Sequence, residues 1–260
     1  MFDFKEKPTE RKIIIIIDYS TKRKLISNSD DLEIKMNSPI MIVEDDELLK
    51  RDNYPFVANL KQGGLIEPGK ILVQDYYDED NYFPATEAKY KTALKKVMLY
   101  QTFFFLLGAK TFKYIELAEI SNNSETLMEG GIEASGTVVS ANVDVKYKTK
   151  IDNALRSQLS IESRVREQKC NIDEAKSFMY KKRLNSDLFL ENILENFKYG
   201  RNLEQTNVKI RLLREVNQII SILARAKLNI LFSSFEIGGK LNEEIKSTSD
   251  FVANFNVSWV

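Results

Sequence analysis

The expected fold depends on one stretch, Thr86–Ala109, which reads TEAKYKTALKKVMLYQTFFFLLGA and becomes steadily more apolar from start to end. Its first half carries apolar residues at three- and four-residue steps: Tyr90, Ala93, Leu94 and Val97. This spacing is typical of an amphipathic helix. The first half is therefore predicted to be helical, with one apolar face against other elements.

The second half of this stretch, Val97–Leu107, presents apolar side chains in nearly every direction, so it must be enclosed. A membrane-spanning helix needs about 20 apolar residues, and this run has about half that number. We therefore predict a central helix buried in a globular core, and Gly108 is suited to end it.

Around this helix the sequence predicts an α+β fold. A mixed or antiparallel sheet packs on the central helix, and long β-hairpins flank a segment of three helices in the second half. The chain of 260 residues is 43% hydrophobic and can bury one large core, so 1–260 is expected to be a single domain. The alternative is a subdivision into an α+β part with the central helix, 1–130, and a part with hairpins and helices, 131–260.

Strands are expected on both sides of the central helix. β-Branched and apolar runs predict them at Lys12–Asp18, Ile40–Val43, Ile71–Val73 and Thr111–Ile120. Lys24–Ser27 and Leu32–Met36 are predicted to form a hairpin around the turn-rich SNSDD. Residues 75–80 are expected to form an acidic loop, and Asn81 or Thr86 is expected to cap the central helix.

The clearest strand signal is an alternation of apolar and polar residues from Thr137 to Thr149, which resumes from Leu155 to Val165. We expect a long antiparallel hairpin, with arms of about a dozen residues against a usual strand of about five or six. A second hairpin is expected from residues 231–241 and from Phe251–Trp259, where the alternation returns.

Three helices are predicted between these hairpins. The first starts at Asn171, which forms a capping-box-like pair with Glu174, and ends near Leu184. The second runs from Ser186 to Gly200. The third begins at Leu203 or Val208 and ends near Lys227, with six residues on its buried face: Leu212, Leu213, Val216, Ile219, Ile220 and Leu223.

The chain contains no histidine and one cysteine, Cys170. Without imidazole, Ser-His-Asp and Cys-His catalysis and histidine zinc sites are excluded. One cysteine cannot form a thiolate zinc cage, an iron–sulfur site or an internal disulfide. Enzymatic activity is therefore the less favoured prediction, and no catalytic residue, cofactor or metal is assigned.

The opening residues 1–12, MFDFKEKPTERK, are charged and lack the apolar segment of a secretory signal. Together with the single cysteine, they predict a cytoplasmic location. The 38 basic and 38 acidic side chains give a net charge of zero. No global electric field therefore recruits nucleic acid or anionic lipid, and such a partner would need a local patch.

Gly64–Lys70, GLIEPGK, has the spacing of a phosphate-binding loop. Its context does not fit, because Ile71 stands where a hydroxyl would hold magnesium, Glu67 adds an anion and Pro68 removes an amide donor. We interpret Pro68-Gly69 as a type II turn that leads into a strand.

Four carboxylates follow predicted strands: Asp18, Glu44, Asp45 and Asp75. Strand ends of this kind hold divalent metals in many phosphoryl-transfer enzymes, so a carboxylate metal enzyme is one hypothesis. A strand that ends in aspartate and is followed by a hairpin resembles ribonuclease H-like nucleases, over about the first 35 residues. Solvated acidic loop ends are the alternative interpretation.

Charge is distributed unevenly along the chain. Residues 44–80 hold 10 acidic and 4 basic residues, and residues 146–227 hold 18 basic and 10 acidic ones. A basic surface for nucleic acid or anionic lipid would centre on Arg156, Arg164, Arg166, Lys181, Lys182 and Arg183. The favoured alternative is an ordinary solvated face of helices and strands.

Two amphipathic hairpins separated by helices resemble the layout of gasdermin-like and perforin-like pore formers, in which tilted hairpins close into a ring. The leading hypothesis is a non-catalytic cytoplasmic interaction or assembly protein with a protein partner or with self-association. A membrane-acting, hairpin-inserting protein that binds anionic membranes is the second hypothesis, and a carboxylate metal enzyme the third. Nucleic acid is a less favoured partner.

Overall fold

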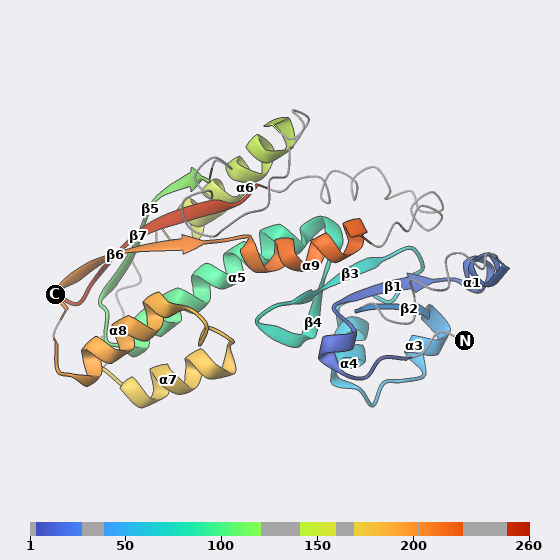
Figure 1. The fold of residues 1–260 in the computed structure, drawn as a ribbon, viewed down its shortest axis with the longest axis horizontal. Helices are drawn as coiled ribbons and strands as arrows, with labels where there is room; N and C mark the ends of the chain where they lie inside the picture. The colour runs from blue at the N-terminus through green and yellow to red at the C-terminus, as the bar shows by residue number, and fades with distance from the viewer. Residues whose placement is uncertain (1–3, 28–38, 121–140, 160–168, 202, 226–248) are drawn as a thin grey trace. The chain divides into compact units, whose positions relative to one another are not determined.

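In a computed structural model, which describes residues 4–27, 39–120, 141–159, 169–201, 203–225 and 249–260, the chain has the predicted α+β fold with two sheets (Figure 1). It divides into two compact units. Unit 1 comprises Met1–Lys91 and Glu215–Thr248, and unit 2 comprises Thr92–Arg214 and Ser249–Val260. A single domain over 1–260, or a boundary between 130 and 131, stays a prediction.

Unit 1 contains a four-stranded mixed sheet in the order β2-β1-β3-β4. Its strands are β1 (Ile13–Ile17), β2 (Ile40–Glu44), β3 (Ile71–Asp75) and β4 (Asp78–Pro84). β1 pairs parallel with β2 and antiparallel with β3, which forms a hairpin with β4. All five isoleucines of β1 are fully buried. A strand that is covered on both faces requires such a continuous apolar run.

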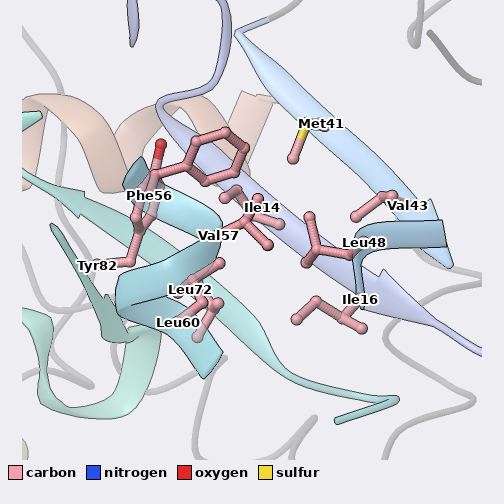
Figure 2. Packing of buried hydrophobic residues seen from close by; sticks show 10 residues of the cluster. All are labelled: Ile14, Ile16, Met41, Val43, Leu48, Phe56, Val57, Leu60, Leu72 and Tyr82. Atoms are coloured by element: carbon pink, nitrogen blue, oxygen red, sulfur yellow. The ribbon is translucent and has the colours of Figure 1, made fainter. Parts of the chain in front are cut away.

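One face of this sheet is covered by two short helices, α3 (Asp45–Leu49) and α4 (Pro55–Gln62). Figure 2 shows Val57 of α4 beside Ile14 of β1, and Leu48 of α3 near Ile16. The buried cluster comprises Ile14, Ile16, Met41, Val43, Leu48, Phe56, Val57, Leu60, Leu72 and Tyr82. It is the apolar core that joins α3 and α4 to the sheet.

A buried arginine, Arg11, lies between the 3-10 turn Pro8–Glu10 and β1. Its guanidinium donates hydrogen bonds to the Glu79 carbonyl at 2.9 Å, to the Tyr82 hydroxyl at 2.8 Å and to the Asp80 carboxylate at 2.9 Å. It also lies 4.2 Å from the ring centre of Phe56. A buried charge is tolerated only when its donors are satisfied in this way. Arg11 therefore holds the segment before β1 against β4.

The predicted central helix is α5 (Ala85–Leu106), which begins in unit 1 and continues in unit 2. Its apolar second half is largely buried, as predicted, and only Met98 and Thr102 form an exposed strip. The expected N-caps are wrong, because Asn81 lies in β4 and Thr86 lies inside the helix. β4 runs directly into α5 and leaves no room for a separate cap.

Four helices end in the same backbone turn, in which one residue adopts a left-handed conformation. In α5 that residue is Gly108, and the Ala109 amide donates to the Phe104 carbonyl at 3.0 Å. α4 and α8 end with glycine at the equivalent position, and α7 ends with Arg183. The predictions that Gly108 and Gly200 end helices are confirmed. Arg183 is the one non-glycine residue among those described that adopts this conformation.

Unit 2 contains a three-stranded antiparallel sheet in the order β5-β7-β6. Its strands are β5 (Thr111–Glu119), β6 (Gln205–Arg211) and β7 (Phe251–Ser258), and its helices are α6 (Ala141–Leu159), α7 (Ile172–Lys181) and α8 (Leu188–Lys198). In Figure 1, β7 lies between β5 and β6. α7 begins at the predicted Asn171–Glu174 capping pair, and Asp187, one residue after the predicted Ser186, caps α8.

The predicted first long hairpin is wrong, because residues 141–159 form helix α6. Among the side chains of α6 that the structure describes, the buried ones are Ile151, Leu155 and Leu159. A step of four fits both a helix and a strand that alternates every two residues, so the pattern did not distinguish them. Residues 137–140, 160–166 and the strand expected at 231–241 lie outside the described residues.

Other elements also differ from the prediction. Tyr19–Ser27 is a helix, α1, in place of the first hairpin arm, and residues 28–38 lie outside the described part. The expected acidic loop mostly belongs to β4. The expected third helix splits into β6 and α9 (Arg214–Arg225). α3 and α4 were not predicted. Within the described residues, no helix combines the length and apolarity that crossing a membrane requires.

Removing the Tyr82 hydroxyl by Tyr82→Phe is expected to destabilise the protein by about 1–2 kcal/mol, because it breaks hydrogen bonds with buried Arg11. Burial raises the pKa of Tyr82 to about 12, against 10.0 for an exposed tyrosine. Since the folded state holds this proton more tightly, the stabilisation is present below pH 10 and is lost as pH rises toward 12.

The gap in stability between wild type and Tyr82→Phe should therefore narrow between these two pH values. Urea unfolding at neutral pH and at a series of alkaline pH values measures it. A gap that stays constant over that range would contradict the role given to the hydroxyl.

Candidate interaction surface

The two faces of the three-stranded sheet in unit 2 differ sharply. Alternate residues of β7 are fully buried: Phe251, Ala253, Phe255 and Val257. Phe255 stacks on Phe112 of β5 at 4.6 Å between ring centres, and Phe104 of α5 lies 5.9 Å from Phe112. This inner face is the core of unit 2. An antiparallel sheet of this kind commonly leaves its other face in water.

We call that other side of the sheet the outer face. The strand register places four residues of each strand on it, in four rows that cross β5, β7 and β6. The rows are Thr111–Ser258–Gln205, Lys113–Asn256–Asn207, Glu116–Asn254–Lys209 and Ala118–Val252–Arg211. None of these residues is buried, and all but Ala118 and Val252 are polar.

Hydrogen bonds between strands hold the amides at the centre of the outer face. The Asn256 amide donates to the side-chain oxygen of Asn207 at 3.0 Å, and the Asn254 amide donates to the Glu116 carboxylate at 2.9 Å. The Asn254 side-chain oxygen is enclosed and accepts no hydrogen bond from any described residue. Polar atoms of this kind are normally satisfied, so an enclosed acceptor without a donor requires an explanation.

Asp250 fixes one end of this surface. Its buried carboxylate accepts hydrogen bonds from the Leu213 and Phe251 amides, both at 2.8 Å, and from the Arg211 guanidinium. Arg211 is therefore neutralised by an ion pair. Lys113 and Lys209 form no ion pair with any described residue and are exposed. The remaining charge of the outer face comes from these two lysines and Glu116.

The two edge strands of this sheet, β5 and β6, differ in regularity. β5 contains a bulge at Ile115, where the register with β7 shifts. β6 pairs with β7 without a shift along its whole length. Bulges twist an edge strand and prevent further pairing. Among the described residues, β6 is therefore the more regular edge.

The backbone of β6 alternates between β7 and the opposite edge of the strand, which pairs with no strand among the described residues and is called the free edge. The Trp259 amide donates to the Glu204 carbonyl at 3.0 Å, and the Leu212 amide donates to the Phe251 carbonyl at 2.8 Å. Because backbone groups alternate in direction, Thr206, Val208 and Ile210 bond to β7. The residues that point their amides and carbonyls to the free edge are Gln205, Asn207 and Lys209, and Arg211, which has a further interaction partner, points its backbone groups the same way.

The strand-end carboxylates do not converge. Asp18 follows β1 and accepts hydrogen bonds from the Thr21 amide and the Ser20 hydroxyl. These bonds lower the pKa of Asp18. Glu44 lies at the same end of the sheet and pairs with Lys22. Asp75 lies at the opposite end, because β3 is antiparallel to β1.

Asp45 lies in the first turn of α3. Asp75 is fully buried and accepts from the Tyr77 amide at 3.0 Å. Within the described residues, no group of acidic side chains or cysteine is placed to share a metal ion. The hypothesis of a site formed by these four carboxylates is therefore not supported by their positions.

The expected basic surface is divided. Arg156 of α6 pairs with Asp152 at 2.9 Å and lies 5.6 Å from the Tyr114 ring centre. The hydrogen bond from Arg156 lowers the pKa of Asp152, and burial raises that of Tyr114, whose hydroxyl also bonds to Asp152. Arg164 and Arg166 lie outside the described residues. Lys181, Lys182 and Arg183 lie at the end of α7.

The Gly64–Lys70 motif is the turn that the sequence predicts. Gly69 has a φ of +87°, and the Lys70 amide donates to the Glu67 carbonyl at 3.2 Å. These are features of a type II turn with proline before glycine. β3 begins at Ile71, so no helix follows to bind phosphate.

The first half of α5 buries polar side chains that sequence reasoning missed. Lys89, Thr92 and Lys96 recur at three- and four-residue steps on one face of the helix and are buried. Both lysines have interaction partners. The predicted apolar positions Tyr90 and Leu94 are only half-buried. The buried side of this half is therefore more polar than the predicted face.

Comparison with protein-family models, curated proteins and solved structures gave no match.

Proline substitutions test the alternation along β6. Val208→Pro should destabilise unit 2 by about 3 kcal/mol beyond Val208→Ala, because it removes an amide that bonds to β7. Lys209→Pro should stay within about 1 kcal/mol of Lys209→Ala, because its amide points to the free edge. Urea unfolding measures the free energy of unfolding of the proline and alanine variants at both positions. Equal losses at the two positions would contradict the derived register.

Proposed function

We propose that the protein is a non-catalytic interaction protein of the cytoplasm, and that a protein partner docks on the outer face. The observation that carries the proposal is the centre of this face, where Asn207, Asn254 and Asn256 are joined to neighbouring strands by hydrogen bonds between side chains. Side chains that are already ordered lose little conformational entropy when a partner binds. The Asn254 side-chain oxygen has no donor among the described residues, and a donor of the partner would reach it only after the Asn254 side chain turns away from its enclosed position.

The charges of the outer face define the chemistry of that partner. Lys113 and Lys209 lie on opposite sides of β7, and Glu116 lies in the same row as Lys209. A partner that places carboxylates opposite the two lysines, and amide donors opposite Glu116 and Asn254, would be complementary. The face has no aromatic residue, although aromatic side chains usually form the energetic centre of tight interfaces. We therefore expect a weak, hydrated and salt-sensitive complex.

The two other hypotheses have less support. The carboxylates of the metal-enzyme hypothesis lie at two ends of one sheet. The membrane-inserting hypothesis needed a long hairpin, and residues 141–159 of that hairpin are helical. The interaction hypothesis uses elements that are present, namely β5, β6 and β7.

Asn254→Val tests whether the central amide serves binding rather than stability. A β-branched residue suits a central strand and removes an acceptor that lacks a donor. We expect stability to stay unchanged or to rise by up to about 1 kcal/mol, as measured by urea unfolding. A loss of stability of more than about 1 kcal/mol would mean that the Asn254 amide is needed for folding. That result would remove this support for a docking role.

Reversal of the two free lysines tests the docking surface itself. The variant Lys113→Glu with Lys209→Glu should keep the fold and lower the affinity for the partner at least about tenfold. The matched control reverses Lys176 and Lys198, which are exposed on α7 and α8 of the same unit. The partner is first identified by affinity capture with wild type, and its binding is then measured with purified proteins at two salt concentrations.

The proposal is supported if wild type and the control variant bind the purified partner alike, binding weakens with salt, and the outer-face variant loses binding. It is overturned if the outer-face variant binds as well as wild type, or if no purified protein binds the wild-type chain.

A further inference from the structure

We propose that β6 pairs antiparallel with β6 of a second copy of this chain, so that two three-stranded sheets join into one six-stranded sheet. The inference rests on the proposed function, because the joined sheet enlarges the outer face that is proposed to bind the partner. It arises from the free edge of β6, from the residues that a second copy would bring opposite each other, and from the size of the outer face.

The free edge of β6 has the groups that strand pairing needs. Gln205, Asn207, Lys209 and Arg211 point their backbone amides and carbonyls away from β7. Gln205, Asn207 and Lys209 are exposed. β6 contains no proline and its register contains no bulge. Proline and bulges are common means by which proteins prevent edge pairing, and β5 has such a bulge.

The sequence of β6 fits its own antiparallel copy when the two-fold axis passes through Val208. Asn207 then lies opposite Lys209 of the second copy, Gln205 lies opposite Arg211, and Val208 lies opposite itself. Asn207 and Lys209 both have outward backbone groups, so the two Asn207–Lys209 pairs that the axis relates can exchange backbone hydrogen bonds. No like charges are directly opposite, which would be destabilising. An axis through Lys209 would instead place the two Lys209 side chains opposite each other.

This arrangement keeps both outer faces on the same side. The two-fold axis is perpendicular to the sheet, so residues that face outward in one copy face outward in the other. One copy offers four residues from each of three strands, which is fewer than the roughly 20–30 residues that each partner contributes to a standard interface. The joined sheet doubles this number and brings it into that range.

The first test is the mass of the full chain in solution, measured by light scattering over a concentration series from about 1 to about 100 μM. We expect a species of twice the chain mass of 30.1 kDa that dissociates on dilution. Lys209→Pro should raise the dissociation constant at least about tenfold, because it removes an amide at the free edge and places a ring against the second strand. Lys209→Ala is the matched control and should still dimerise.

The second test is the register, in a Cys170→Ser background that removes the single cysteine. Asn207→Cys and Lys209→Cys chains, one of them tagged, are mixed and oxidised. In the proposed register these positions face each other at about 5.5 Å between Cα atoms, which suits a disulfide. The mixture should therefore form a cross-linked heterodimer, and each chain alone should cross-link much less.

A monomer throughout the concentration series overturns the inference, as does a dimer that Lys209→Pro leaves intact or that cross-links at neither position. These outcomes are distinct from failure of the proposed function. A monomer whose partner binding is still lost on reversal of Lys113 and Lys209 would keep the docking surface and reject the dimer. A dimer of the predicted register that binds no partner would keep the dimer and reject the docking surface.

Discussion

The pairing of β7 with both β5 and β6 is the interaction on which unit 2 depends. β5 and β6 are far apart in sequence and join one sheet only because β7 lies between them. The inner side chains of β7 are the centre of the core, and its outer side chains are the centre of the polar face. Closing such a long-range pairing costs chain entropy before the buried rings of Phe112 and Phe255 can offset it. The core and the candidate surface therefore form together, when β7 enters the sheet.

Local signals predicted much of this fold. β1, β2, β3, β5 and β7 were located from β-branched runs or alternation, and α5, α7 and α8 from helical spacing, capping residues or glycine. These signals are short in range, so they survive without knowledge of tertiary contacts. The failures have physical causes. Leu155 and Leu159 are four residues apart, a step shared by helices and strands, and the acidic residues of β4 conceal a strand that Arg11 holds through Asp80 and the Glu79 carbonyl.

The candidate surface could be predicted only in part. Residues 251–259 showed their alternation, so Asn254 and Asn256 could be assigned to one face of a strand. The pairing partners of that strand could not be assigned, because cross-strand neighbours such as Glu116 and Asn207 depend on register. β6 did carry a usable signal: Thr206, Val208 and Ile210 are β-branched and alternate with polar residues. The following α9 pattern, with Val216, Ile219 and Ile220, outweighed it, and the bulge at Ile115 interrupted the alternation in β5.

The polar residues of the outer face also protect the register of β7. A slip of one residue would bury Asn254 and Asn256 and expose Phe255 and Val257, so these positions must be polar whether or not a partner binds. Serine, threonine or a charged residue would meet that need equally well. Protection of the register does not require an asparagine that donates to Asn207 across strands, nor an enclosed Asn254 oxygen without a donor. Register protection therefore explains why the face is polar, while the ordered amides at its centre are the part that binding explains better.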